Sequence, residues 1–567
     1  MKMKLNQSKL KLLLLGVLSV SALNVFADNK IITSSTIETG ASYNDSDPNL
    51  AALNVTTNGV TYSGTNITLS ATSNDYSFTD GALFNPNGKG AYIINGAILS
   101  LTDSYITTSG SWGFGVGLFG SSGTLNNLVF QSTGERGYGA FASNNSTLTM
   151  NGGSVTTNNA GSRGVRLQYG SSATLNGVDI TTYGGSQSAG VYMMINSTLN
   201  LTGGSIRTFN GSGVGIHISQ TSSADLYNVN IQTEGDSNSY AINVATSSTL
   251  TLDGGIISTN GLAGHGIQVT GSSTANISNV NVQTQGAQSY GVGMGGSVTL
   301  TDSDIHTSGS GSWGVYVSST NSGTVSNVNI QTEGAAAHGA YVANSSTLTM
   351  TDSDISATGN NADAINVASR STATVNLNHH TITGNILAGG TSTLTITGSN
   401  SASLTGNVTG TTGGTIGITL TDAGTELHGN FRQTGAATAI NLTVGAGALF
   451  HGSGELDSLT LESGAIIGYA DDVLLVTDSI TIGDNITIDF GNLTETGDYL
   501  VFDWSNASGG DSINASQFSV TDPGIEGSFS VDNNQLTFNA TAVPEPSTWF
   551  LIGAGLGALA LIRRRSS

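Results

Sequence analysis

Three observations predict an all-β fold, a right-handed parallel β-helix with coils of about 25 residues. A small residue followed by an apolar one returns about every 25 residues between positions 90 and 365, and self-similarity at such a period is typical of repeat architectures. Short segments such as 146–150 alternate polar and apolar side chains, which is the period of a β-strand. Helical spacing of apolar residues is absent between the two ends of the chain. The right hand follows from the rule for parallel crossover connections.

A column of turn-forming residues explains how each coil bends. An apolar residue, most often Ile, recurs with the same period, and three positions before it the chain has Gly, Asn or Asp in every coil. These residue types tolerate left-handed backbone geometry, so we expect one tight bend per coil at this position. The column consists of Asp103, Asn127, Gly152, Gly177, Gly203, Asn228, Gly254, Asn279, Asp302, Asn327 and Asp352.

Two other columns predict how the interior is filled. One alternates large and small residues, as in Leu99, Gly123, Leu148 and Ala173, which makes the repeat a two-coil unit of about 50 residues with large side chains packed over small ones. A second column has inward parity and predicts an internal stack of Thr108, Thr157, Thr182, Thr208, Thr233, Thr259, Thr284, Thr307 and Thr332. The outward column beside it mixes Gln, Arg and His with Thr, which disfavours a flat ice-binding face.

Changes in periodicity divide the chain into five segments. Before residue 90 the pattern is irregular, as expected of a cap on the open end of a solenoid. After residue 375 the period loosens, and aromatic residues gather near the end as in a terminal core. The predicted segments are a signal peptide (1–27), an N-terminal cap (28–89), a regular β-helix (90–375), less regular coils with a C-terminal β cap (376–541) and a sorting signal (543–567).

The N-terminus has the three parts of a secretory signal peptide. Its basic region contains Lys2, Lys4, Lys9 and Lys11. A short apolar region follows from Leu12 to Val20, and small residues at Val25 and Ala27 predict cleavage by signal peptidase before Asp28.

The C-terminus also has three parts in a fixed order. They are the motif Val543-Pro544-Glu545-Pro546, the apolar run 549–562, and the basic cluster Arg563, Arg564 and Arg565. This arrangement resembles the PEP-CTERM sorting signal. The resemblance implies that an exosortase cuts near the Pro-Glu-Pro motif and delivers the protein from a Gram-negative-type bacterium to the cell surface or beyond. The apolar run of 14 residues is shorter than the ~20 that span a bilayer comfortably. We therefore expect a transient anchor in the inner membrane, with the arginines on the cytoplasmic side; a permanent tail anchor is the alternative.

The composition excludes some partners. The formal net charge is −22, and a surface of this sign repels nucleic acid and anionic lipid. The chain has no cysteine, so disulfides and thiol chemistry are excluded.

The repeat resembles the passenger regions of autotransporters. It also resembles the β-helices of polysaccharide lyases and hydrolases such as pectate lyase, whose sites need carboxylates converging from neighbouring coils. The best candidates here are two Thr-Asp-Ser-Asp strings, with Asp302 and Asp304 in one and Asp352 and Asp354 in the other. Asp302 and Asp352 occupy the turn column, where a structural role suffices. The four are therefore weak calcium candidates, and no catalytic residue or cofactor is predicted beyond structural calcium as an option.

Other polar groups predict no chemistry of their own. Arg163, Arg166 and Arg207 are candidates for an acidic sugar but are expected to be solvated surface charges. The pair His379-His380 has no carboxylate at a metal-binding spacing.

These features together predict a non-enzymatic surface or matrix protein, adhesive or associated with exopolysaccharide and biofilm. Its expected partners are signal peptidase, exosortase, extracellular polysaccharide or other cell surfaces, and transiently the inner membrane. The alternative is a polysaccharide lyase or hydrolase on the same fold. Release and continued anchoring of the mature protein both stay open at this point.

Overall fold

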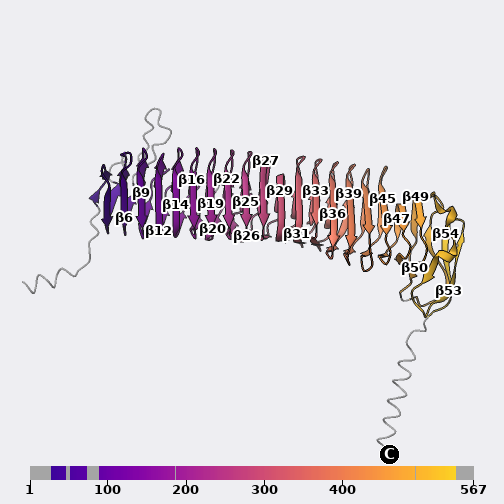
Figure 1. Ribbon diagram of the computed structural model, residues 1–567. Helices are drawn as coiled ribbons and strands as arrows, with labels where there is room; N and C mark the ends of the chain where they lie inside the picture. The colour runs from indigo at the N-terminus through magenta and orange to yellow at the C-terminus, as the bar shows by residue number, and fades with distance from the viewer. Residues whose placement is uncertain (1–26, 46–50, 73–87, 186, 492, 544–567) are drawn as a thin grey trace, which may run out of the picture.

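The computed structural model describes residues 27–45, 51–72, 88–185, 187–491 and 493–543. Parallel strands stack coil upon coil into a rod of about 18 turns (Figure 1). The described chain starts at one end of the rod and finishes at the other, so strands that neighbour each other in space are one coil apart in sequence. The predicted all-β parallel β-helix is confirmed.

Each coil contributes a strand to three faces, which we call the first, second and third face. In one coil these strands are β15 (Arg163–Leu167), β16 (Ser172–Asn176) and β17 (Asp179–Thr182). They pair in parallel with β18 (Ala189–Met193), β19 (Thr198–Thr202) and β20 (Ser205–Phe209) of the next coil. Asn176 Nδ2 donates a hydrogen bond to Asn151 Oδ1, the equivalent residue of the preceding coil. The two are 25 residues apart, which is the coil length that the sequence predicts.

The remaining strands extend these faces in both directions. The first face also contains β2 (Lys30–Ile32), β5 (Leu53–Val55), β8 (Lys89–Ile94), β11 (Phe114–Phe119), β13 (Tyr138–Ser143), β21 (Val214–Ile218), β24 (Ile242–Val244), β30 (Trp313–Val317), β32 (Ala340–Val342), β35 (Asp363–Val367), β38 (Asn385–Ala388), β41 (Val408–Thr411) and β44 (Phe431–Thr434). The second face contains β3 (Thr36–Thr39), β6 (Thr61–Thr65), β9 (Ile98–Thr102), β22 (Ser223–Tyr227), β25 (Thr249–Asp253), β33 (Thr347–Thr351), β36 (Thr372–Asn378), β39 (Thr393–Ser399), β42 (Thr415–Leu420) and β45 (Ala439–Val444). The third face contains β1 (Ala27–Asp28), β4 (Ser42–Asp45), β7 (Thr68–Ala71), β10 (Tyr105–Thr108), β23 (Asn230–Glu234), β26 (Ile256–Thr259), β28 (Asn281–Thr284), β34 (Asp354–Ala357), β37 (Thr381–Thr383), β40 (Ser403–Thr405), β43 (Glu426–His428), β46 (Leu449–His451), β48 (Ile466–Gly468), β50 (Ile486–Asp489) and β52 (Phe518–Val520).

Seven long strands run round a corner and belong to more than one face. They are β12 (Ser122–Ser132), β14 (Thr147–Thr157), β27 (Ile267–Ser278), β29 (Tyr290–Thr307), β31 (Ser322–Thr332), β47 (Gly454–Leu461) and β49 (Leu474–Ile482). Their pairing stays parallel on both sides of the corner, as between β12 and β14. The corner therefore bends the sheet without interrupting it.

The interior explains the small-then-apolar signature of the sequence. A Cβ added at Gly164 would lie 2.3 Å from Ile180 Cγ2 and 2.6 Å from the carbonyl oxygen of Gly190. The glycine of the first face therefore packs directly against the apolar column of the third face, and a side chain at this position must displace one of them.

The predicted turn and threonine columns are both present. All eleven turn residues have positive φ, from 48° to 75°, in the left-handed region that Gly, Asn and Asp tolerate. All nine threonines of the predicted internal stack are buried, with at most 2% of their surface exposed. These two predictions are confirmed.

Residues 27–45 and 51–72, within and beside the segment predicted as an N-terminal cap, carry strands that continue the same three faces. Leu53 of β5 pairs in parallel with Ala91 of β8, for example. The end of this first stretch is closed by a polar cluster. The carboxylate of Glu38 accepts hydrogen bonds from Lys30 Nζ at 2.8 Å, from the Tyr62 hydroxyl at 2.9 Å, and from the Tyr43 hydroxyl. Charged and hydroxyl groups thus cover the apolar interior at this end of the described coils.

Beyond residue 375 the coils continue with fewer residues each. Equivalent residues lie 22 apart at Asn378 and Asn400 and 21 apart at Ser458 and Ser479. The rod then closes with an antiparallel unit, in which β54 (Gln535–Ala542) pairs with both β51 (Gly497–Asp503) and β53 (Glu526–Asp532). Two short 3₁₀ helices, η1 (Gly510–Ser512) and η2 (Ala515–Gln517), lie between β51 and β52.

An aromatic core fills this C-terminal unit, which we call the cap. Phe538 lies with its ring centroid 4.7 Å from Phe490 and 4.8 Å from Phe529, and Phe518 is 5.8 Å from Phe529. Phe502 and Trp504 are each 1% exposed. The aromatic residues that gather near the end of the sequence therefore form one terminal core.

Candidate functional site

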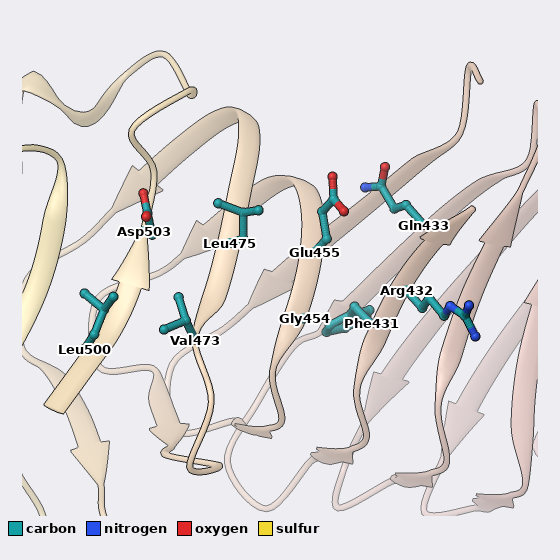
Figure 2. Close-up of a pocket in the computed structure, with 9 residues that line it drawn as sticks. All are labelled: Phe431, Arg432, Gln433, Gly454, Glu455, Val473, Leu475, Leu500 and Asp503. Atoms are coloured by element: carbon teal, nitrogen blue, oxygen red, sulfur yellow. The ribbon is translucent and has the colours of Figure 1, made fainter. Parts of the chain in front are cut away.

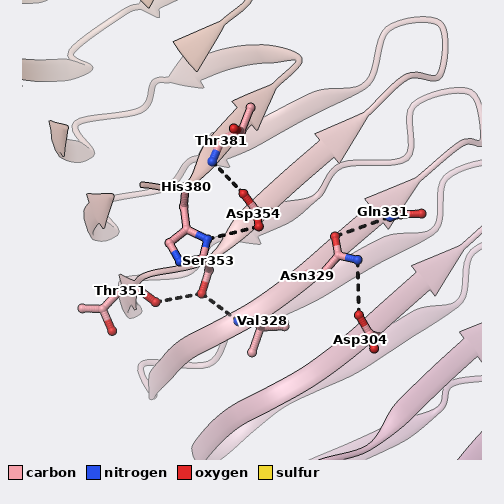
Figure 3. Close-up of polar contacts among 9 residues, drawn as sticks. All are labelled: Asp304, Val328, Asn329, Gln331, Thr351, Ser353, Asp354, His380 and Thr381. Atoms are coloured by element: carbon pink, nitrogen blue, oxygen red, sulfur yellow. Dashed lines mark hydrogen bonds and ion pairs between the residues drawn. The ribbon is translucent and has the colours of Figure 1, made fainter. Parts of the chain in front are cut away.

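The two Thr-Asp-Ser-Asp strings lie two coils apart, each at the corner between the second and third faces, and the structure gives the Asp and the Ser at this corner a structural role. Asp302 and Asp352 occupy left-handed turns. The serine that follows each of them accepts a hydrogen bond from a backbone N–H one coil earlier: Ser303 from Val280 at 3.2 Å, and Ser353 from Val328 at 3.1 Å (Figure 3). The string therefore fastens one coil to the previous one.

Three of the four predicted carboxylates line one small pocket of about 180 Å³. They are Asp302, Asp304 and Asp354, and the pocket wall also includes Asn327 and Asn329 from the coil between them. Asp352 does not line it. The volume is below the ~300–1,000 Å³ of pockets that hold small organic ligands.

The carboxylates in this pocket accept hydrogen bonds from their neighbours. Asn327 Nδ2 donates to Asp302 Oδ1 at 2.7 Å, and Asn329 Nδ2 donates to Asp304 Oδ1 at 3.2 Å. Asp354 accepts from the backbone N–H of Thr381 at 2.7 Å (Figure 3). Because an asparagine coil separates the two aspartate coils, the carboxylates bind amides instead of facing each other.

One interpretation of the sequence is wrong at this pocket. Local spacing predicts no carboxylate partner for His380, yet its Nδ1 lies 3.1 Å from Asp354 Oδ2 (Figure 3). Ile355 pairs with Ile382 in the next coil, 27 residues further on, whereas Ile330 and Ile355 of the preceding pair are 25 residues apart. The changed coil length brings His380 beside a residue 26 positions earlier, which no local motif indicates.

Metal binding finds limited geometric support in the part of the chain that the structure describes. There, no group of three or more His, Cys, Asp or Glu side chains is placed so that it could hold a metal ion. Calcium at Asp302, Asp304, Asp352 or Asp354 stays a prediction of the sequence.

The outward side of the first face carries a row of stacked rings, which we call the aromatic ladder. It consists of Tyr240, His265, Tyr290, Trp313 and His338, one from each of five successive coils. Successive centroids are 5.0, 4.1, 5.1 and 6.3 Å apart. Stacking of this kind follows from the coil spacing of ~4.8 Å.

Within the ladder, His265 is held neutral. Burial lowers its pKa to about 4, and its Nδ1 accepts a hydrogen bond from the backbone N–H of Tyr290 at 3.1 Å. The ring therefore acts as an uncharged member of the stack at neutral pH.

Nearer the N-terminus, two arginines pack on the same outward side of the first face. The guanidinium of Arg163 lies 4.2 Å from the ring centroid of Tyr192, and that of Arg166 lies 5.2 Å from Tyr138, whose hydroxyl accepts a hydrogen bond from Arg166 at 2.7 Å. Burial lowers the pKa of Arg163. The expectation of solvated charges is wrong for these two residues, because aromatic side chains flank them. Arg207 is exposed on the third face and does not join them.

A larger pocket of about 460 Å³ lies where the last coils meet the cap (Figure 2). Val473, Leu475 and Leu500 give it an apolar wall, and Glu455 and Asp503 lie on either side of Val473 and Leu475 in the close-up. Asp503 accepts a hydrogen bond from Gln535 of the cap at 2.8 Å. The pocket thus marks the joint between solenoid and cap.

The predicted processing residues lie at the limits of the described chain. Ala27 and Asp28 form β1, which pairs in parallel with Tyr43 and Asn44. Val543 packs against the core of the cap. The other predicted sorting residues, Pro544, Glu545, Pro546, Arg563, Arg564 and Arg565, lie outside the described residues. Within the described ranges, no helix has both the length and the apolar character needed to cross a bilayer.

Comparisons with known proteins agree with this architecture. Residues 240–409 match the family model of a right handed beta helix region, and residues 542–566 match the PEP-CTERM protein-sorting motif. The chain is a right-handed parallel β-helix with a PEP-CTERM sorting motif. Its β-helix is similar to a chain in the cryo-EM structure of the Vag8–C1 inhibitor complex, with a TM-score of 0.50 and 20% identity over 75% of this chain and 94% of that one. No curated protein sequence matches the chain.

Two features of the β-helix were missed by sequence reasoning although signals for them exist. The aromatic ladder follows from aromatic residues that recur just before the small residue of the repeat, as at Tyr240, Tyr290 and Trp313. The later coils repeat Gly-Asn followed by an apolar residue at 384, 406 and 429. Each signal has the period of a coil and would have appeared in a search aligned on these positions.

Proposed function

We propose that this exported β-helix is a non-enzymatic surface or matrix protein that adheres to extracellular polysaccharide. The PEP-CTERM motif at residues 542–566 carries the proposal, because it couples a long rod to delivery outside the cell. Exosortase processing at this motif would free the rod from a transient inner-membrane anchor, either for release or for attachment at the cell surface.

The geometry of the third face supports a role without catalysis. The pocket with three aspartates has a volume of about 180 Å³, and amides or backbone N–H groups already donate to each of them. A glycosidase needs two carboxyl groups that flank the scissile bond with room for the sugar between them. The outward side of the first face supports adhesion instead, because it presents aromatic rings over many coils.

The test is retention of the full chain, purified in detergent, on an array of bacterial and plant polysaccharides, with the same samples assayed for cleavage. We expect retention without cleavage. The proposed function requires no cofactor, so EDTA is expected to leave retention unchanged. Cleavage that disappears in Asp302→Ala or Asp354→Ala would instead establish the alternative, a polysaccharide lyase or hydrolase.

A further inference from the structure

A notch of about 380 Å³ interrupts the first face beside the aromatic ladder. Along the outward column of this face, Gln268 of β27 is in register with Gly293 of β29, and Gly293 with Tyr316 of β30. Neighbouring coils place a side chain at this position, but Gly293 has none. The missing side chain leaves an open space between Gln268 on one side and the ring of Tyr316 on the other.

The corner beside Gly293 widens the same space. The coil of β29 is short, since Ser289 and Ser312 are equivalent at a separation of 23 residues. The pairing of β27 with β29 shifts register between Thr270 and Thr274, because β29 has fewer residues at this corner. The corners of the two flanking coils therefore project beyond it and form the ends of the notch.

The lining is uncharged and rich in hydrogen-bonding groups. Hydroxyls of serine and threonine come from both flanking corners, and no lining residue is acidic or basic. Asn321 Nδ2 donates to the carbonyl oxygens of Gly295 and Ser319, each at 2.9 Å, which fixes one corner. Gln268 Oε1 is buried without a hydrogen-bond partner. Because solvent does not reach this oxygen, the Gln268 amide must turn towards the notch before a bound hydroxyl can donate to it, and that turn would remove the cost of an unpaired buried acceptor.

The aromatic wall of the notch is held in place from behind. The ring centroid of Tyr316 lies 4.7 Å from Trp313, 4.8 Å from Tyr290 and 5.7 Å from Tyr341. A ring supported on several sides keeps its orientation without loss of side-chain entropy on binding. It offers an apolar surface beside a set of hydroxyl and amide groups.

We propose that this notch binds a neutral saccharide unit of a longer glycan. A sugar ring combines hydroxyls, which suit the lining, with a C–H face, which suits the ring of Tyr316. The volume of the notch lies in the range of small-ligand pockets. An anionic sugar is disfavoured because the lining offers no cation and the chain has a formal net charge of −22. This inference rests on the proposed adhesive function and specifies where and what the protein binds.

The test measures binding of short neutral oligosaccharides of glucose, mannose and galactose to the full chain, with oligogalacturonate as the anionic probe. Tyr316→Ala removes the wall. Gly293→Asn fills the notch with a side chain that the same column carries at Asn243 and Asn366. A Cβ at Gly293 would meet Tyr290 Cδ2 at 3.3 Å, so a small ring movement accommodates it. Tyr192→Ala is the matched control, because Tyr192 lies in the same outward column four coils before Gly293, outside the notch and away from Tyr316.

We expect a neutral oligosaccharide to bind, and both notch variants to bind it at least about tenfold more weakly, a change of about 1.4 kcal/mol, while the control keeps the original affinity. Gly293→Asn removes no aromatic ring and so decides the matter if Tyr316→Ala folds poorly. Unchanged binding in Gly293→Asn would overturn the notch but leave the proposed function standing. Preference for oligogalacturonate would overturn the neutral-sugar assignment. A chain that retains no glycan at all would overturn both proposals.

Discussion

The regular coils of residues 90–375 and the later coils of 376–490 build the same three faces. They differ in the joint between coils, by which we mean the contact that holds one coil against the next. In the regular coils, a glycine of the first face packs under the apolar column, as at Gly190, where an added Cβ would lie 2.3 Å from Ile206 Cγ2. In the later coils, an asparagine side chain joins successive coils instead. Asn385 Oδ1 accepts from the backbone N–H of Asn407, and Asn407 Oδ1 from that of Asn430.

The difference shows that the pairing of strands on the faces does not depend on how the backbone is hydrogen-bonded at the corners. Strand pairing stays parallel along the coils of the rod, whether a coil spans 25 or 22 residues. What changes with coil length is how the backbone groups at a corner find partners. A solenoid can therefore vary its coil length, provided that each corner supplies its own hydrogen bonds.

The cap is expected to show the largest effect of a single substitution. Phe538→Ala removes a ring that is 1% exposed and contacts Phe490 and Phe529, so we expect a loss of about 3–5 kcal/mol in stability. Hydrogen exchange measured by mass spectrometry should show faster exchange in β50–β54.

Because each coil contacts its neighbours alone, the regular coils should keep their protection in this variant. The matched control is Phe209→Ala, which removes a partly exposed ring stacked on Tyr183 at 5.0 Å. Faster exchange along the whole rod in Phe538→Ala would show that the two regions unfold together, and the comparison between them would lose its meaning.

The second substitution tests the glycine joint of the regular coils. In Gly190→Val the new side chain must displace Ile206 or the backbone of Gly215, so we expect about 1–3 kcal/mol of destabilisation. Gly417→Val places the same side chain in a later coil, where a Cβ at this glycine meets nothing within 4 Å. Thermal unfolding should separate the two variants; equal transition temperatures would show that the close approach at Gly190 is relaxed in solution.

The asparagine joint of the later coils should respond more weakly. Asn407→Ala leaves the backbone N–H of Asn430 without its acceptor, but both residues are exposed, so water replaces the acceptor and the cost stays below the ~1–3 kcal/mol of a buried unpaired group. Asn329→Ala removes an exposed amide bound to Asp304 in a regular coil and is expected to cost little. Chemical denaturation of both variants gives the comparison, and a larger loss in Asn329→Ala would contradict it.

The smallest effect on stability at neutral pH is expected from substitution of His265 in the aromatic ladder. Burial lowers its pKa to about 4 from the ordinary 6.5, so the folded protein favours the neutral ring. Its contribution to stability is complete above pH 6.5 and declines as the pH falls from 6.5 towards 4. NMR titration of the ring protons should show a midpoint near pH 4. His265→Phe should remove this part of the acid sensitivity, and a midpoint near the ordinary value of 6.5 would show that the ring is exposed.

The repeat was predictable because its steric rules act within one coil. A left-handed turn restricts the residue type at one position, and all eleven turn residues obey that rule. Inward parity restricts the threonine column in the same way. Such rules leave a mark at a constant spacing, which a single sequence displays.

The candidate sites were less predictable because they arise where the period changes. The contact of His380 with Asp354 depends on a coil of altered length, and the notch depends on a missing side chain at Gly293 combined with a short corner. The packing of Arg163 and Arg166 on aromatic rings depends on register between coils. Each is a relation between coils, so composition and local motifs do not indicate it.

The most direct test of the central claim is the mass and location of the mature protein in its own cells. Intact-mass analysis should give a chain that begins at Asp28 and ends near Pro544-Glu545-Pro546, and protease added to intact cells should reach it. A cell-associated chain that keeps Arg563, Arg564 and Arg565 and resists the protease would contradict surface delivery, and with it an adhesive role outside the cell.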